Sequence, residues 1–198
     1  MSAPREAERS GARAVKARVA LCAALALAAA SPAAAQAPAE SAARDAFLRA
    51  APVFQHPRCT NCHNRGDGPK QGNTPRTHIS NVKRGPEGRG QANRPCTSCH
   101  KATNTAGGAM PGAPDWRMPP PGRAGWDGLT PSEICAALKD PARNAGLTPD
   151  QLVAHLEKDA LVAWAWAPGG IRNKPPLAQP EFLSLMRTWR DGGAPCPG

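Results

Sequence analysis

Cys59-Thr60-Asn61-Cys62-His63 and Cys96-Thr97-Ser98-Cys99-His100 are two copies of one pattern, and they decide how the rest of this chain can fold. Each is a C-x-x-C-H run, the pattern that attaches a c-type haem. The chemistry requires this order, because two thiols add to the two vinyl groups of one porphyrin and the next imidazole binds the iron. We therefore expect two covalent haems c. The attachment and proximal-ligand residues would be Cys59, Cys62, Cys96, Cys99, His63 and His100.

Two C-x-x-C pairs can also form a structural zinc ribbon. Here 33 residues separate Cys62 from Cys96, more than the ~15–20 of the usual zinc spacing. A zinc ribbon does not need a histidine directly after each pair, and it is usually cytosolic. A thioredoxin-like interpretation would need a βαβ pattern, which the sequence does not show. Covalent haem is the better interpretation of both motifs.

The N-terminus predicts export. Five basic residues precede an apolar run over residues 19–30, which is shorter than the ~20 apolar residues of a membrane-spanning helix. Ala35-Gln36-Ala37 fits the small-x-small pattern of a cleavage site. We expect a signal peptide over residues 1–37 and a mature periplasmic protein, residues 38–198, with no stable membrane span.

Composition and cysteine count predict a small domain with one disulfide. The expected mature chain has 161 residues, a formal net charge of +7, eight aromatic residues and no tyrosine. A core of protein alone would be thin, and two porphyrins would supply the missing apolar bulk. Outside the signal and the haem motifs only Cys135 and Cys196 remain, so an exported chain predicts a disulfide between them.

Helices are predicted mainly in the C-terminal third. Two capping boxes, Thr130-Pro-Ser-Glu133 and Thr148-Pro-Asp-Gln151, open helices that should run to about residues 139 and 158. The amphipathic stretch 181–190 predicts a last helix. Nearer the N-terminus, residues 41–50 contain strong helix formers and end before Pro52.

Between these helices the chain is rich in Gly and Pro. Residues 64–95 and 104–128 lack an apolar period and predict loops that lie over a prosthetic group. No stretch alternates convincingly as a strand. The expected fold is therefore mainly α and loop-rich, a single dihaem cytochrome c domain with few or no strands.

The distal side of each iron is less determined than the proximal side. His155 shares the inward face of its helix with Leu152 and Leu156, which favours ligation, and His78 is one of few residues between the motifs able to close a site. Met186 belongs to the apolar stripe of the last helix, which favours core packing. The other candidates are His56, too close to Cys59 for that cysteine's own haem, and the Met-Pro residues Met110 and Met118. Bis-histidine ligation would lower the reduction potential, and a thioether would raise it.

Basic residues dominate the segment between the motifs. Residues 58–94 carry eight Arg and Lys against two acidic residues. Such a segment could neutralise haem propionates or steer an acidic redox protein. Nucleic acid is a poor candidate partner, because the chain is exported and shows no base-stacking motif.

With the flanks His56-Pro-Arg-Cys59, Asp140-Pro-Ala-Arg143 and Leu152-Val-Ala-His155, the chain resembles a family of small exported dihaem cytochromes c. The resemblance covers nearly all of the chain after the signal. Members are often labelled as the haem subunit of a molybdenum hydroxylase, isoquinoline 1-oxidoreductase. The resemblance implies that electrons pass from such an enzyme through the haems to a respiratory acceptor. It also implies His63 and His100 as proximal ligands, with His78 and His155 as the best distal matches.

The sequence thus predicts an electron carrier without a substrate of its own. The alternative is a dihaem peroxidase or a haem-based sensor, in which one iron keeps an open site; the chain is short for a dihaem peroxidase. A zinc-ribbon binding module is a third hypothesis.

Overall fold

The structure, a computed structural model, describes residues 32–123 and 125–198, which belong to one compact unit. The expected signal peptide lies outside the described residues except for its last few positions, which begin the first helix. No helix in the described part of the chain is long and apolar enough to cross a membrane.

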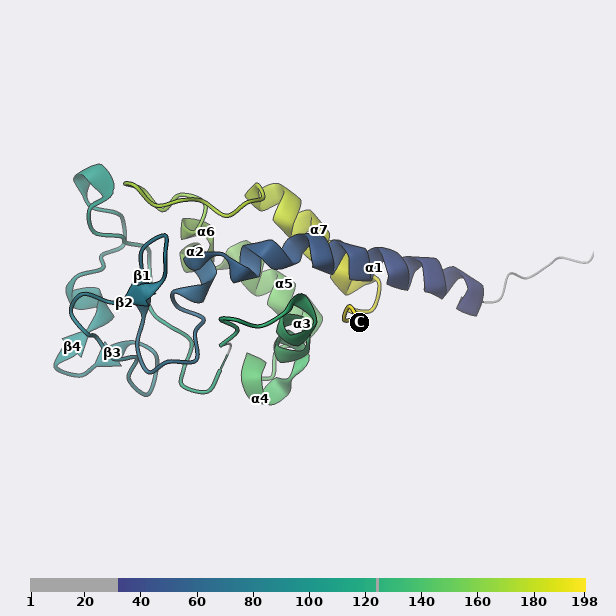
Figure 1. The fold of residues 1–198 in the computed structure, drawn as a ribbon, viewed down its shortest axis with the longest axis horizontal. Helices are drawn as coiled ribbons and strands as arrows, with labels where there is room; N and C mark the ends of the chain where they lie inside the picture. Colours follow the sequence, from purple (N-terminus) through teal and green to yellow (C-terminus); the bar gives the residue numbers. More distant parts are fainter. Residues whose placement is uncertain (1–31, 124) are drawn as a thin grey trace, which may run out of the picture. The chain divides into compact units, whose positions relative to one another are not determined.

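Helices and loops dominate, with only four two-residue strands (Figure 1). The helices are α1 (Pro32–Gln55), α2 (Pro57–Thr60), α3 (Pro131–Lys139), α4 (Pro141–Asn144), α5 (Pro149–Lys158), α6 (Ala160–Trp164) and α7 (Gln179–Asp191), with short 3₁₀ turns at Cys96–Ser98 and Ala106–Gly108. The strands are β1 (Lys70–Gln71), β2 (Arg76–Thr77), β3 (Gly90–Gln91) and β4 (Arg94–Pro95). The expected mainly α, loop-rich fold with few strands is confirmed at this level.

Local capping signals account for the helices that the sequence predicted. Both capping boxes form: the Thr130 and Thr148 hydroxyls accept from the backbone N–H groups of Glu133 and Gln151, whose side chains bond back. Three short helices, α2, α4 and α6, were not predicted. Asp140 caps α4 and Asp159 caps α6, each by accepting backbone N–H groups of the next turn.

The first helix is longer than predicted, because it continues through Pro52 to Gln55. A proline inside a helix costs about 3 kcal/mol. Val53 and Phe54 follow it and are buried at 0% and 2% exposure. Burying such side chains contributes about 1.5–3 kcal/mol each, so tertiary packing overrides the local breaker.

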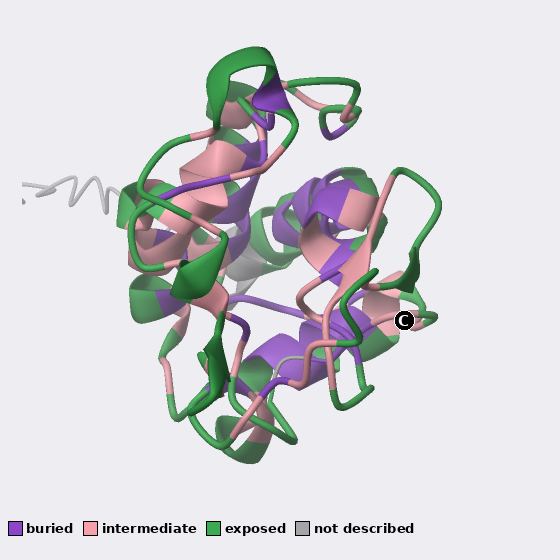
Figure 2. Cartoon of the chain, turned by 90° about the vertical axis from the view of Figure 1, so that its left-hand side faces the viewer, coloured by how far each residue is buried: buried purple, intermediate pink, exposed green. Residues whose placement is uncertain are grey.

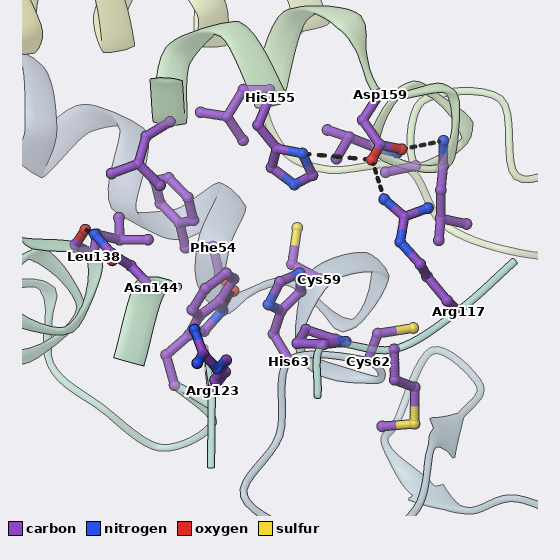
Figure 3. A pocket seen from close by; sticks show the side chains of 18 of the residues that line it. Phe54, Cys59, Cys62, His63, Arg117, Arg123, Leu138, Asn144, His155 and Asp159 are labelled. Carbon is purple, nitrogen blue, oxygen red and sulfur yellow. Dashed lines mark hydrogen bonds and ion pairs between the residues drawn. The ribbon is translucent and has the colours of Figure 1, made fainter. Parts of the chain in front are cut away.

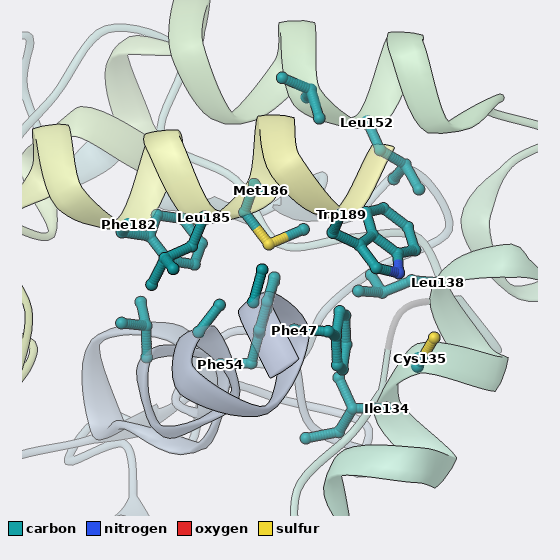
Figure 4. Packing of buried hydrophobic residues seen from close by; sticks show 14 of the residues in the cluster. Phe47, Phe54, Ile134, Cys135, Leu138, Leu152, Phe182, Leu185, Met186 and Trp189 are labelled. Atoms are coloured by element: carbon teal, nitrogen blue, oxygen red, sulfur yellow. The ribbon is translucent and has the colours of Figure 1, made fainter. Parts of the chain in front are cut away.

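The core lies where α1 and α7 pack together, with α3 and α5 beside them (Figure 4). Phe47 lies 5.4 Å from Trp189 between ring centroids, and Phe54 lies 5.3 Å from Phe182. Met186 is 1% exposed within this cluster, as its apolar stripe predicted.

The predicted disulfide between Cys135 and Cys196 is confirmed, with Cα atoms 5.5 Å apart. It ties the C-terminal tail to α3. Closing a loop of 61 residues contributes about 4 kcal/mol in the chain-entropy model.

The long segment between α2 and α3 was predicted as loop and contains two small antiparallel hairpins, β1–β2 and β3–β4. Figure 2 shows this side of the chain, where exposed and half-buried residues prevail. Buried Arg84 holds it together by donating to the carbonyls of Asn64, Gly66 and Pro119 at 2.7, 2.9 and 2.6 Å. Arg84 therefore has a structural role inside the loops, whereas the sequence analysis counted it among the basic residues that could neutralise haem propionates or steer a redox protein.

A close backbone contact fixes the same segment to the loop before α3. The Met118 N–H donates to the Gly88 carbonyl at 2.8 Å. Gly88 has φ +72°, and a Cβ there would lie 2.0 Å from the Met118 carbonyl oxygen. Only glycine fits this position.

Candidate functional site

The first C-x-x-C-H motif opens onto a cavity of about 440 Å³ between α2, α5 and the core (Figure 3). This volume is within the range of about 300–1,000 Å³ for small-molecule and cofactor sites. The lining is mostly apolar and includes Phe54, Leu152 and Phe182. Cys59, Cys62, His63 and His155 all line it. The structure therefore joins the first motif to a histidine about ninety residues further along the chain.

The geometry of the first motif follows from α2. His56 is the N-cap, and its Nδ1 accepts from the Arg58 N–H at 3.2 Å. The short helix turns the chain so that the His63 N–H donates to the Cys59 carbonyl at 2.9 Å. His56 therefore has a capping role, and the linings of the two cavities described here do not include it.

A tryptophan fixes the plane of the His63 ring. The rings of His63 and Trp126 stack with centroids 4.0 Å apart and planes at 11°. The Trp126 indole N–H donates to the Phe54 carbonyl at 2.7 Å, and the Trp126 N–H donates to the His63 carbonyl at 3.1 Å. The imidazole is thereby held to the end of α1.

His155 reaches the same cavity from α5, and Figure 3 shows its ring directed to the side where Cys59 and His63 lie. Its Nδ1 is 3.4 Å from Oδ2 of Asp159, which also accepts from Arg117 at 2.6 Å. A carboxylate on Nδ1 fixes the tautomer and leaves Nε2 for a ligand. Burial lowers the pKa of His155, against the opposing effect of Asp159. Neutral imidazole is the form that binds a metal.

The second motif opens onto a larger cavity of about 970 Å³, built from loops and hairpins. Cys96, Cys99, His100 and His78 line it. The His100 ring stacks on Trp116 with centroids 4.3 Å apart, and its Nδ1 lies 2.8 Å from the Pro111 carbonyl oxygen. This carbonyl has the same effect at His100 that Asp159 has at His155, because it leaves Nε2 available.

The separation of His78 and His100 tests whether they could bind one metal from opposite sides. Metal–nitrogen bonds of about 2 Å, with each ring centre about 1 Å beyond its nitrogen, place two such rings about 6 Å apart. The observed centroid separation is 6.1 Å. Burial lowers the pKa of both imidazoles, which favours the neutral ligand form. His78 and His100 are therefore close enough that both could bind one metal ion.

The two cavities adjoin. Both linings include the same five residues, Arg58, Cys62, Trp116, Met118 and Trp164. Trp116 and Trp164 meet edge to face with centroids 4.9 Å apart. Met118 is buried in this shared wall, and Met110 lines only the second cavity.

The cysteine environments bear on the zinc hypothesis. Burial raises the pKa of Cys59 to about 12 and that of Cys62 to about 11. Structural zinc takes thiolates that converge on one ion, whereas Cys59 lines only the first cavity, Cys96 and Cys99 line only the second, and Cys62 lines both. In residues 32–123 and 125–198 no group of three or more His, Cys, Asp or Glu side chains is placed to hold a metal ion.

Sequence reasoning missed the residues that orient the histidines. Trp116, Trp126 and Pro111 act on rings that lie from 11 to 63 positions away in the sequence, and no local pattern links them. Asp159 could have been found, because it lies one helical turn after His155.

Comparison of the chain with protein-family models, with curated proteins and with solved structures found no match. The resemblance to small dihaem cytochromes c therefore rests on the motifs and their flanks and stays a prediction.

Proposed function

We propose that this protein is an exported electron carrier with two covalently bound haems c, one in each cavity. One observation supports this most strongly. Each C-x-x-C-H motif shares its cavity with a second histidine from outside the motif, His155 for the first motif and His78 for the second. His63 and His155 would hold the iron of one haem, and His100 and His78 the iron of the other. Two histidines on each iron would suit electron transfer, because neither iron would then have a site for a substrate.

A haem bound in each cavity would supply an iron that cycles between Fe(II) and Fe(III). The chain's own residues set the conditions for that cycling. Asp159 and the Pro111 carbonyl contact Nδ1 of His155 and His100, which leaves Nε2 of each ring as the nitrogen for a ligand bond. Stacking on Trp126 and Trp116 restricts rotation of the His63 and His100 rings. A rigid ligand set lowers the reorganisation that accompanies a change of charge.

The shared wall supports exchange of electrons between the two sites. Cys62 belongs to the first motif and lines both cavities, and Trp116 stacks on His100 of the second. The two cavities therefore suit consecutive carriers in one path.

The disulfide and the solvent-facing basic residues support the proposed setting. Disulfides persist in oxidising compartments such as the periplasm. The Cys135–Cys196 disulfide, which joins α3 to the C-terminal tail, is of this kind. A redox protein, acidic in character and of the molybdenum hydroxylase type that the resemblance implies, would donate electrons, and a respiratory acceptor would receive them.

Expression with export and the haem c maturation machinery tests the proposal. We expect two covalently attached haems per chain, counted as the pyridine haemochrome of denatured protein. Replacing Cys59 and Cys62 with alanine should leave one haem, and so should replacing Cys96 and Cys99. A wild-type protein that matures without covalent haem would contradict the proposal.

Carbon monoxide added to the reduced protein separates the carrier from the peroxidase or sensor. Two occupied axial positions at each iron predict no rapid binding at neutral pH. Fast binding at one iron would favour an open site and the alternative function.

A further inference from the structure

Two large apolar side chains stand out on the rim of the second cavity. Ile79 is 79% exposed and Ile171 is 93% exposed, and both belong to the lining of this cavity. Single exposed isoleucines need no explanation. These two come from segments more than ninety residues apart in the sequence and converge on one opening, which calls for a reason.

Both isoleucines are held in place by the β1–β2 hairpin. The Ile79 N–H donates to the Gln71 side chain at 3.1 Å. Asn73 donates to the Ile171 carbonyl at 2.9 Å and accepts from the Asn173 N–H at 2.9 Å. The exposed side chains are therefore presented on fixed backbone, which lowers the entropy lost when a partner binds.

Arg172 anchors the turn that carries Ile171. Its guanidinium donates to the carbonyls of Gly108 and Ala109 at 2.5 and 2.8 Å, and to that of Gly169 at 3.2 Å. Charge-assisted bonds of this kind are the stronger ones. The turn is thus fastened to the loop that follows the second motif.

The charge around this opening has one sign. The lining includes five cations and no carboxylate: Arg58, Lys70, Arg76, Arg94 and Arg172. Arg76 and Arg94 are exposed, and neither forms a salt bridge within the described part of the chain. The first cavity differs, because Glu87 and Asp159 contribute to its lining.

We propose that this rim, made of Ile79, Ile171, Arg76 and Arg94, is the docking surface for an acidic redox protein, and that electrons enter or leave through the second site. The inference rests on the proposed function. A small apolar centre with a charged border is the arrangement of transient redox complexes. The cations steer the partner from a distance, and the isoleucines make the short-range contact.

A small acidic flavodoxin serves as the probe. One electron passes from its reduced flavin to a ferric iron, and stopped-flow absorbance gives the bimolecular rate constant. Binding of the oxidised flavodoxin to the immobilised dihaem protein is measured separately by surface plasmon resonance. Haem content and the visible spectrum of every variant are recorded first.

Charge reversal on the rim is compared with charge reversal away from both cavities. Arg76→Glu should lower the rate constant and the affinity about tenfold at low ionic strength, and the loss should shrink in high salt. Arg49 is exposed on α1 and lines neither cavity, so Arg49→Glu is the matched control and should change both by less than about twofold. Equal losses for the two variants would overturn the inference.

The apolar contact is tested in the same way. Ile171→Ser should weaken binding several-fold in low and high salt alike, whereas Leu48→Ser, on the 45% exposed Leu48 of α1, should leave it unchanged. An Ile171→Ser protein that binds normally but has a shifted haem spectrum would show that this side chain covers the haem, and would overturn the docking role. A wild-type protein without haem contradicts the proposed function, whereas one with two haems and no rim dependence contradicts only this inference.

Discussion

The two C-x-x-C-H motifs have the same chemistry in opposite surroundings. The first lies against the helical core, where α1, α5 and α7 supply buried apolar walls. The second lies among hairpins and loops, with exposed residues at its edge and a cavity twice as large. One motif is therefore positioned by protein packing, and the other by hydrogen bonds between loops. Under the proposed function, the first site would be an internal carrier next to the core and the second a carrier at the surface.

The two regions also differ in what stabilises them. Aromatic contacts and the disulfide hold the helical side together. The loop side relies on the bonds from Arg84, the close approach at Gly88 and the bonds from Arg172. The following substitutions probe this contrast.

The largest effect is expected on the helical side. Trp189 is 0% exposed, packs on Phe47 and lines neither described cavity. Trp189→Ala should lower the free energy of unfolding by about 3–5 kcal/mol through lost burial and a new void. Urea unfolding measures this. A loss below about 1 kcal/mol would show that the core contributes less than its packing indicates.

The disulfide should contribute nearly as much. Replacing Cys135 and Cys196 together with alanine should lower the free energy of unfolding by about 2–4 kcal/mol, because the unfolded chain regains the entropy of a 61-residue loop. Both haems should remain attached, since neither cysteine belongs to a motif. Loss of haem in this variant would mean that the bond also shapes the sites.

A smaller and local effect is expected on the loop side. Arg84 is 3% exposed, and Arg84→Met leaves three carbonyls without their donor. We expect a loss of about 1–3 kcal/mol. Hydrogen exchange should rise in residues 64–128 and stay unchanged in α1 and α7. Arg187→Met, at an exposed pair with Glu157, is the control and should cost less than about 1 kcal/mol. If hydrogen exchange in Arg84→Met rose equally in residues 64–128 and in α1 and α7, the two regions would not be stabilised separately.

The smallest effect concerns the tuning of one site. Asp159 gives His155 anionic character through its Nδ1 contact, and this favours the ferric iron. Asp159→Asn should therefore raise the potential of one haem by tens of millivolts and leave the other unchanged, as measured by spectroelectrochemistry. A shift of both potentials by the same amount would point to a general charge effect.

The features that local sequence patterns determine were predicted correctly. The capping boxes predicted α3 and α5, the apolar stripe predicted α7, and the cysteine count predicted the Cys135–Cys196 disulfide. The end of α1 was wrong, because burial of Phe54 outweighs the breaker at Pro52. The short helices α2, α4 and α6 were missed.

For the candidate site, adjacency identified the motif residues, and His155 and His78 were among several candidates. Which histidine shares a cavity with which motif depends on the packing of α5 and the β1–β2 hairpin, and local sequence does not encode it. The stacking of Trp126 on His63 is likewise a long-range contact.

Low-temperature electron paramagnetic resonance of the oxidised protein tests the central claim most directly. The proposed pairs predict two low-spin ferric signals of the bis-histidine type in the wild-type protein. His155→Ala should convert one of them to high spin and His78→Ala the other, with both haems still covalently attached. A histidine–methionine signal or a high-spin iron in the wild-type protein, or an unchanged low-spin spectrum in either variant, would contradict the account.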